Sequence, residues 1–263
     1  TPTRPPSSST APAPVITWCR GGESPAPEPC LNLAVGLAST IGALPQVAVP
    51  VVGTDQLFPV HRVYCVGRNY AEHAKEMGFS DREPPFFFMK PADALVIKGA
   101  PTPYPPLTAD LHHEIELVVA IGREATGVAP EQALDHVWGY AVGLDMTRRD
   151  LQNDMKKQGR PWCIGKGFDY SAPIGPITPA AQVPGIDSAA ISVQVNGLDR
   201  QRSTIAKLIW NVAETIEQLS AAWALQPGDL IFTGTPEGVG AVVRGDTLVG
   251  SIDGLQTITV RVR

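Results

Sequence analysis

The amino-acid sequence predicts an α+β fold with a mixed, curled or barrel-like β-sheet and peripheral helices. Short apolar runs at residues 114–121 and 138–146 are typical of strands covered on both faces. Helical patterns at residues 70–77, 148–158 and 208–225 are scattered among the strands instead of alternating with them, which disfavours a doubly wound sheet. The 26 prolines and 25 glycines favour many turns over a helical bundle.

Strands are expected where apolar runs are bounded by turn residues, and helices where apolar residues recur at helical spacing. Asn69 suits the N-cap of a helix that Gly78 ends, and Gly159 ends a later helix. Asn196-Gly197 is a strong hairpin signal. The expected strands span residues 46–52, 61–66, 86–89, 114–121, 138–146, 191–195, 230–232, 242–243 and 257–262, the expected helices residues 70–77, 130–135, 148–158 and 208–225, and the loops residues 101–106, 161–168 and 233–240.

Composition indicates a packed protein with an irregular N-terminal part. Of 263 residues, 43% are hydrophobic and 18% charged, as expected for a folded domain. Residues 1–45 are rich in Pro, Ser and Ala, so we expect an irregular segment there and a folded domain over residues 46–263. The net charge of −5 disfavours a nucleic-acid or anionic-membrane partner. No uninterrupted apolar stretch is long enough for a membrane-spanning helix.

The four cysteines show neither a C-x-x-C pair nor a zinc-ligand spacing. We expect Cys65 and Cys163 to be reduced, small core residues, whereas the surroundings of Cys19 and Cys30 predict nothing definite. This usage fits a reducing compartment. The expected location is the cytoplasm, or the mitochondrion if the N-terminus is a leader.

Three acidic residues in the two apolar runs suggest a metal site. Glu114 and Glu116 are two apart on one expected strand and so share a face, and Asp145 ends the neighbouring run. Acidic side chains are rarely buried without a partner, and three carboxylates suit a hard divalent cation. The alternative is a solvated strand face whose glutamates pair with lysines.

Further side chains have spacings that suit catalysis. His73 and Glu76 are three apart on one helix face, where the carboxylate would fix the imidazole tautomer and help it deprotonate water; the alternative is a surface pair. Lys90 and the glycine-flanked Lys166 could each reach a developing enolate, or be merely exposed.

Two arginines follow Asp145 directly. Arg148 or Arg149 could grip a keto-acid carboxylate with both nitrogens, or form a surface salt bridge. The acyl end of such a substrate is a further candidate ligand for Arg148.

Several activities are disfavoured. The loop 233–240 lacks the Gly-Lys-Ser/Thr ending of a nucleoside-triphosphate loop, although its glycines let backbone amides approach a small anion. No Gly-x-Ser-x-Gly elbow indicates a serine hydrolase. His112 and His113 would point to opposite strand faces, which disfavours zinc.

Taken in order, these pieces resemble the fumarylacetoacetate hydrolase family over about residues 47–263. The matching stretches are Gly67-Arg68-Asn69-Tyr70 with His73 and Glu76, Lys90-Pro91, His113 to Leu117, Gly139-Tyr140 through Asp145-Met146-Thr147 with Arg149-Asp150, Lys166, and Thr233 to Pro236 through Gly240. Each stretch alone is a weak signal, but the ordered set is highly specific. The resemblance implies a mixed β-roll core and a homodimer.

The resemblance also implies the site. Mg²⁺, with Mn²⁺ or Ca²⁺ as substitutes, would be held by Glu114, Glu116 and Asp145. His73, Glu76 and Lys166 would be catalytic, and Arg149, Gln152 and Thr235 would contact a small-molecule keto acid. The implied reaction is hydrolysis of a C–C bond in an acylpyruvate, with fumarylpyruvate giving fumarate and pyruvate in aromatic acid degradation. The alternatives on the same metal site are decarboxylation of oxaloacetate, or isomerisation or hydration of a dienoic keto acid.

Overall fold

The computed structural model describes residues 42, 45–70, 82–97 and 100–263. Residues 45–263 form one compact unit. The helix expected at residues 70–77 lies almost wholly outside the described residues. No helix among the described residues is long and apolar enough to cross a membrane.

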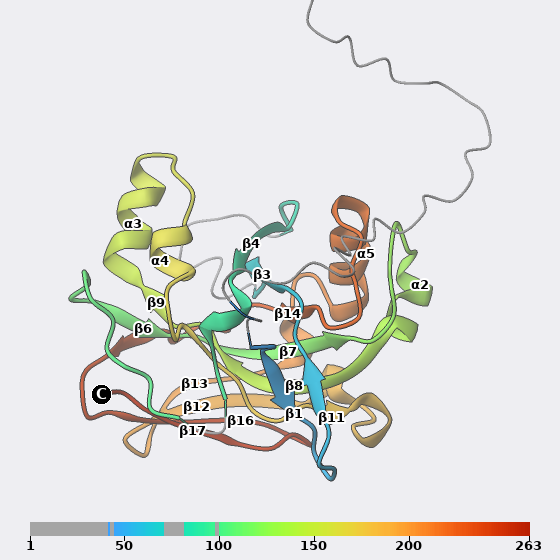
Figure 1. The fold of residues 1–263 in the computed structure, drawn as a ribbon. Helices are drawn as coiled ribbons and strands as arrows, with labels where there is room; N and C mark the ends of the chain where they lie inside the picture. Colours follow the sequence, from blue (N-terminus) through green and yellow to red (C-terminus); the bar gives the residue numbers. More distant parts are fainter. Residues whose placement is uncertain (1–41, 43–44, 71–81, 98–99) are drawn as a thin grey trace, which may run out of the picture. The chain divides into compact units, whose positions relative to one another are not determined.

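A six-stranded mixed sheet forms the centre of this unit (Figure 1). Its strands lie in the order β11-β8-β7-β14-β3-β4. The pair β14 and β3 is parallel and the other neighbours are antiparallel. The strands are β3 (Val63–Gly67), β4 (Phe86–Lys90), β7 (Ile115–Ile121), β8 (Val137–Leu144), β11 (Thr178–Pro179) and β14 (Leu230–Phe232).

A four-stranded antiparallel sheet, in the order β13-β12-β16-β17, lies along one face of the central sheet (Figure 1). Its strands are β12 (Ala190–Val195), β13 (Leu198–Thr204), β16 (Thr247–Ile252) and β17 (Ile258–Arg261). Ile191 and Val193 of β12 belong to the same buried cluster as Ile115 and Val142 of the central sheet. A Cβ at Gly250 would come within 2.7 Å of Ile115 Cδ1, so glycine permits this close approach of the sheets.

Smaller sheets and short helices complete the unit. The remaining strands are β1 (Ala48–Pro50), β2 (Leu57–Pro59), β5 (Leu95–Val96), β6 (Leu111–His113), β9 (Thr147–Arg148), β10 (Ala172–Pro173) and β15 (Gly240–Val242). Among the described residues, the α-helices are α2 (Pro130–Ala133), α3 (Arg149–Lys157), α4 (Cys163–Lys166) and α5 (Val212–Ala222). The α+β prediction is confirmed, and the sheets of the described residues do not close into a barrel.

Some expected elements differ from the observed ones. The region 161–168, expected to be a loop, contains the one-turn helix α4. A Cβ at Gly165 would lie 2.9 Å from Gln152 N on α3, so glycine permits the close approach of α4 to α3. The helix expected at residues 208–225 covers only residues 212–222 and starts at a capping box between Asn211 and Glu214. Cys163 is exposed and is not a core residue, whereas Cys65 is buried as expected.

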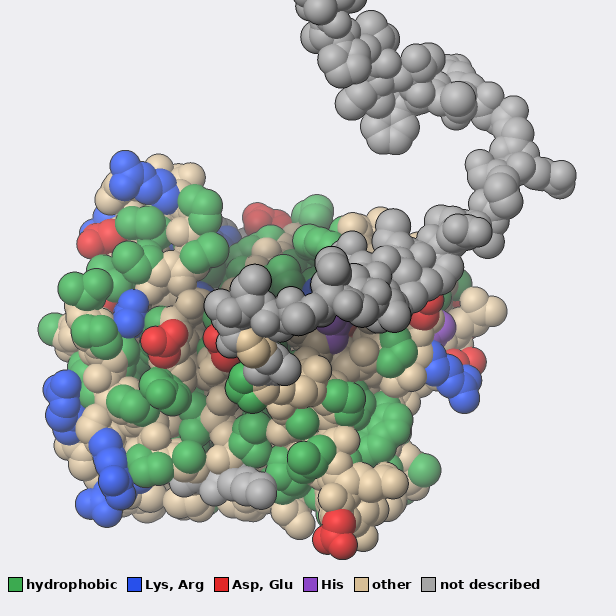
Figure 2. Space-filling view, viewed as in Figure 1, with side chains coloured by type: hydrophobic (Ala, Val, Ile, Leu, Met, Phe, Trp, Pro, Cys, Tyr) green, Lys and Arg blue, Asp and Glu red, His purple; other side chains and the backbone are tan. Residues whose placement is uncertain are grey.

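Charged side chains are interspersed on the face shown in Figure 2. Basic side chains stand mainly at the edges of this face, among acidic and apolar ones. The described residues of this face therefore present no continuous basic surface. That the protein has no nucleic-acid partner stays a prediction from its charge.

Candidate active site

The ends of two paired strands bring three carboxylates together. β7 and β8 are antiparallel, with Ile115 opposite Leu144, so the residue before β7 meets the residue after β8. Those residues are Glu114 and Asp145, whose backbones are joined by a 2.9 Å hydrogen bond from Asp145 N to Glu114 O. One oxygen from each of Glu114, Glu116 and Asp145 lies within 4.8 Å of the others, and all three residues are buried.

Glu114 departs slightly from the expected geometry. It lies between β6 and β7 instead of inside one continuous strand, so strand alternation alone does not set its direction. The hydrogen bond to Asp145 N and the pairing partners of its side chain hold it beside Glu116.

Burial and crowding make the charged form of Glu116 costly. Burial is the largest influence that raises the pKa of Glu116 well above its usual range, and repulsion by Asp145 and Glu114 adds to it. The backbone amide of Gly234 donates a 2.9 Å hydrogen bond to Glu116 Oε2 and offsets part of this cost. A cation next to these carboxylates would lower the cost of keeping Glu116 charged.

Lys166 supplies one such cation. Its ammonium donates to Glu114 Oε2 at 2.7 Å, Asp145 Oδ2 at 2.5 Å and Thr147 Oγ1 at 2.8 Å, which uses all three of its protons. Burial alone would lower the pKa of Lys166, but attraction by Asp145 and Glu114 outweighs it and raises that pKa. Lys166 stays charged at neutral pH.

Lys90 is a second buried cation, and the sequence left open whether it was exposed. It ends β4, and its Nζ lies 2.8 Å from Asp145 Oδ1, outside the hydrogen-bonding directions of that oxygen. The ammonium donates to Met146 O at 3.2 Å and to Lys166 O. Lys90 therefore joins the backbone at Met146 to the backbone at Lys166, next to Asp145.

Helix α3 carries the expected substrate contacts. Arg149 donates to Glu114 Oε1 and, at 2.7 Å, to Gln152 Oε1. Both residues are buried and line the same cavity as the carboxylates. Thr235 lines it too, and its hydroxyl donates to Ile115 O at 2.8 Å.

Arg148 does not line this cavity. Its guanidinium lies 4.4 Å from the centre of the Phe168 ring, and Nη1 donates to Ile164 O at 3.3 Å. A role for Arg148 in gripping the acyl end of a substrate therefore gains no support from this arrangement and stays a prediction. His73 and Glu76 lie outside the described residues, so their roles remain expectations from sequence.

Gln201 is a buried residue that sequence reasoning missed. It accepts hydrogen bonds from His113 Nδ1 at 3.0 Å and Ile115 N at 3.1 Å, and it donates to Thr235 Oγ1 at 2.9 Å. It thereby ties β13 to the start of β7 and to the loop 233–240. No local pattern around Gln201 signals this, because its partners are distant in the sequence.

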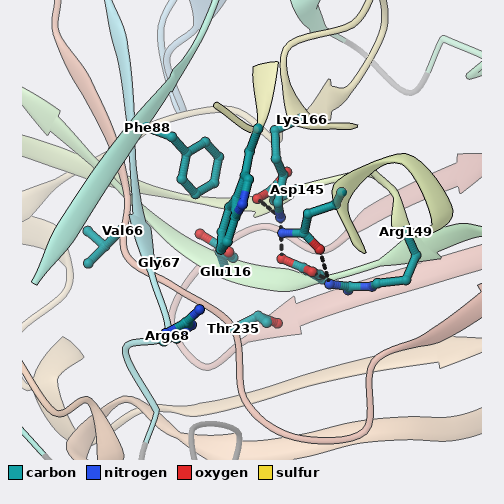
Figure 3. A pocket seen from close by; sticks show the side chains of 12 residues that line it. Val66, Gly67, Arg68, Phe88, Glu116, Asp145, Arg149, Lys166 and Thr235 are labelled. Carbon is teal, nitrogen blue, oxygen red and sulfur yellow. Dashed lines mark hydrogen bonds and ion pairs between the residues drawn. The ribbon is translucent and has the colours of Figure 1, made fainter. Parts of the chain in front are cut away.

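The carboxylates face a small cavity that Figure 3 shows from close by. Its volume is about 30 Å³, enough for a water molecule or an ion. The lining residues are Val66, Gly67, Arg68, Phe88, Glu114, Glu116, Asp145, Arg149, Gln152, Trp162, Lys166 and Thr235.

The donor set fits a hard divalent cation. Carboxylate oxygens are the ligands such ions prefer, and those of Glu114, Glu116 and Asp145 already converge. Soft or zinc-type donors take no part in this cluster of the described residues. Fold and site together define a β-rich enzyme whose buried acidic centre binds a divalent metal.

Comparisons with known proteins agree. The family described as fumarylacetoacetate (FAA) hydrolase C-terminal matches residues 62–263. A fumarylpyruvate hydrolase of Ralstonia sp. is 48% identical over 180 residues, 68% of this chain and 93% of that protein. An oxaloacetate tautomerase of Escherichia coli is 41% identical over 206 residues, 78% of this chain and 94% of that protein. The chain belongs to the fumarylacetoacetate hydrolase family.

A solved structure of high similarity is that of fumarylpyruvate hydrolase from Pseudomonas aeruginosa in complex with Mn²⁺ and pyruvate. It is 59% identical, has a TM-score of 0.84, and the match covers 86% of this chain and 99% of that one. A 5-carboxymethyl-2-hydroxymuconate delta-isomerase from Mycobacterium smegmatis is 35% identical with a TM-score of 0.70, covering 82% and 81% of the two chains.

Proposed function

We propose that this protein is a metal-dependent hydrolase that cleaves the C–C bond of an acylpyruvate, with fumarylpyruvate as substrate and fumarate and pyruvate as products. The observation that carries the proposal is the convergence of three buried carboxylates with Lys166 at one cavity. The relatives named fumarylpyruvate hydrolase, at 48% and 59% identity, support the substrate.

In this proposal Glu114, Glu116 and Asp145 hold the metal, which supplies Lewis-acid polarisation of the keto acid when bound. Arg149 and Gln152 orient the keto-acid carboxylate. His73, paired with Glu76, takes a proton from water, and the hydroxide attacks the far carbonyl. The bond between that carbonyl carbon and the pyruvate methylene breaks, and its electron pair remains on the pyruvate part as an enolate.

Lys166 acts on that enolate. Its ammonium is charged and buried, so a hydrogen bond to the developing oxyanion is stronger than it would be in water. Protonation of the enolate carbon completes pyruvate, and the acyl part leaves as a carboxylic acid. To reach the substrate, Lys166 must exchange part of its contact with the carboxylates.

The proposal also covers the identity of the metal ion and the oligomeric state of the protein. We propose Mg²⁺ as the resident ion, with Mn²⁺ or Ca²⁺ able to replace it, because all three prefer oxygen ligands. We further propose a homodimer in the cytoplasm that acts in aromatic acid degradation. The bacterial relatives support this setting, and light scattering of the purified protein tests the dimer.

A second candidate is enolate chemistry on oxaloacetate, without attack by water. Oxaloacetate tautomerases at 40% and 41% identity, from Rattus norvegicus and Escherichia coli, favour it. Decarboxylation of oxaloacetate and isomerisation of a dienoic keto acid belong to the same class. These reactions share the stabilised enolate with hydrolysis. They differ from hydrolysis because water does not attack a carbonyl carbon.

A side-by-side assay separates the candidates. Fumarylpyruvate, acetylpyruvate and oxaloacetate are each incubated with enzyme and Mg²⁺, and the products are followed by NMR. We expect fumarate and pyruvate from the first and acetate and pyruvate from the second. Release of carbon dioxide or tautomerisation alone, without acid formation, would overturn the hydrolase proposal.

Glu116→Gln tests the metal centre. The amide keeps the shape of the side chain but removes one anionic ligand, so turnover should fall at least about 100-fold. The increase in melting temperature that Mn²⁺ produces should shrink as well. Unchanged turnover and an unchanged Mn²⁺ effect would show that Glu116 is not a ligand. Glu131→Gln, at a charged position on the short helix α2, is the matched control.

A further inference from the structure

Arg68 stands in an unusual backbone conformation at the edge of the cavity. It follows the last residue of β3 and has φ of +58°, in the left-handed region. This region is unfavourable for residues with a Cβ by about 1–2 kcal/mol, and such strain persists only where the surroundings hold it. Neither the metal centre nor the proposed chemistry accounts for Arg68.

Two aromatic rings hold its guanidinium. Arg68 Cζ lies 5.3 Å from the centre of the Phe86 ring and 5.9 Å from the Trp162 ring. The rings themselves meet edge to face, with centres 5.0 Å apart and planes at 89°. At Gly67 a Cβ would lie 2.0 Å from Phe86 Cζ, so only glycine lets the Phe86 ring pack there. Phe86 begins β4 and Trp162 precedes α4, so distant segments build this support for Arg68.

The supported guanidinium shares the cavity with the carboxylates. Arg68 and Arg149 both line it. In Figure 3 Arg68 lies below Glu116 and Arg149 lies to its right, so the two arginines reach the carboxylates from different directions. A molecule whose keto-acid end lies at the metal ligands and Arg149 can direct its other end toward Arg68.

Other cations lie near Arg68, in a cavity that also holds the carboxylates of Glu114, Glu116 and Asp145. Burial lowers the pKa of Lys156 on α3, and repulsion by Arg68 and Arg149 lowers it further, which places three cations within range of one another. Burial is also the main influence on Arg68, whose pKa is lowered while the exposed Glu83 raises it. An arginine keeps its charge at neutral pH all the same. Such a group of cations attracts a dianion more strongly than a monoanion.

We propose that Arg68 is the specificity-determining residue that binds the acyl-end carboxylate of a dicarboxylic acylpyruvate. This inference rests on the proposed function and names the end of the substrate that sequence could not assign. The planar guanidinium can donate two parallel hydrogen bonds to a carboxylate. The Phe86 and Trp162 rings restrict its orientation, so little conformational freedom is lost on binding. An acyl end without charge gains none of these contacts.

The test compares two substrates that differ in this carboxylate. Values of kcat/KM for fumarylpyruvate and for acetylpyruvate are measured with the wild type, Arg68→Met and Arg68→Lys. The ratio of the two values should fall about 10- to 100-fold in Arg68→Met, the range expected for loss of a charge-assisted hydrogen bond. Arg68→Lys, which keeps the charge but not the fork, should give an intermediate ratio. Thermal melting shows whether each variant is folded.

Arg148→Met is the matched control. It removes an arginine that stacks on Phe168 and does not line the cavity, so the ratio should stay at the wild-type value. An unchanged ratio in both folded Arg68 variants would overturn the assignment of Arg68 while leaving the hydrolase proposal intact. If the wild type splits neither substrate, the proposed function itself fails, and the role of Arg68 fails with it.

Discussion

At the scale of single residues, Lys166 neutralises the carboxylate cluster. Its three hydrogen bonds end on Glu114, Asp145 and Thr147. Ion pairs of this kind cost desolvation when they form, yet removing one partner leaves a buried charge without compensation. A metal held by Glu114, Glu116 and Asp145 would neutralise two of the carboxylates that Lys166 pairs with, so either cation would offset the loss of the other.

Lys166→Met should therefore lower stability in the absence of metal and enlarge the effect of metal. We expect a loss of about 3 kcal/mol in the free energy of unfolding. The rise in melting temperature on adding Mn²⁺ should exceed that of the wild type, because the ion neutralises charges that Lys166 no longer covers. Denaturation with and without Mn²⁺ measures both quantities.

The control for this variant is Lys157→Met. Lys157 is exposed and lies 3.8 Å from Asp154, a surface pair whose loss should leave the stability almost unchanged. A metal-free Lys166→Met protein as stable as the wild type would contradict the compensating role of Lys166.

At the scale of elements, the loop between β14 and β15 shapes the site through its backbone. Thr233 and Thr235 donate their hydroxyls to Leu117 O and Ile115 O, at 3.0 and 2.8 Å. Between them the amide of Gly234 donates to Glu116. The loop therefore continues the contact of β14 with β7 and fixes Glu116 through the amide of Gly234. The loop binds an anion as its glycines suggested, but that anion is a carboxylate of the protein itself.

Gly234→Ala should disturb this loop and the metal site together. Gly234 has φ of +98°, and a Cβ there would lie 2.7 Å from Asn69 Cβ. Backbone strain and this clash should lower stability by about 1–3 kcal/mol. Mn²⁺ affinity should fall as well, because Glu116 loses the position of its amide partner. Melting curves and a Mn²⁺ titration measure the two effects.

Gly245→Ala isolates the backbone contribution. Gly245 has a similar φ of +97°, but nothing lies within 4 Å of a Cβ there. We expect a smaller loss of stability and wild-type Mn²⁺ affinity. If both substitutions changed stability and Mn²⁺ affinity equally, the contact with Asn69 and the amide of Gly234 would not contribute to the metal site.

At the scale of the whole molecule, local patterns predicted most strands of the central sheet and the acidic cluster. The expected strand at residues 230–232 coincides with β14, and the hairpin at Asn196-Gly197 joins β12 to β13. The acidic residues stood out because charge inside unbroken apolar runs demands a partner. Acidic residues inside apolar runs can be recognised from the sequence alone, so Glu114, Glu116 and Asp145 could be identified without the structure.

Features that depend on distant contacts could not be predicted. The burial of Lys90 depends on Asp145 and on the backbone of Met146, far along the chain. The turn direction that brings Arg68 to the cavity and Arg148 away from it is set by tertiary packing. Strand β16 was missed because its glycine and polar residues hide the alternation. His73 and Glu76 stay predictions.

Cys65 reports the integrity of the central sheet. It lies fully buried in β3, between β14 and β4, whereas Cys163 is exposed. Burial, with repulsion by Asp145 next, raises the pKa of the Cys65 thiol well above its ordinary value of 9.0. In a variant with Cys19→Ser and Cys30→Ser, iodoacetamide at pH 8 should modify Cys163 quickly and Cys65 only when the protein opens.

Metal and pH should then shift the modification of Cys65 in defined directions. A metal at 100 times its dissociation constant stabilises the folded state by about 2.7 kcal/mol and should slow the reaction about 100-fold. The thiol of Cys65 holds its proton more tightly in the folded protein than in the unfolded chain. Its contribution to the stability of the folded state is therefore complete below pH 9.0 and is lost as the pH rises above 9.0. Cys65 modification should therefore accelerate above pH 9.0 more than that of a free thiol. Mass spectrometry of each cysteine gives the rates, and a Cys65 rate equal to that of Cys163 would show that β3 opens locally, independently of the metal centre.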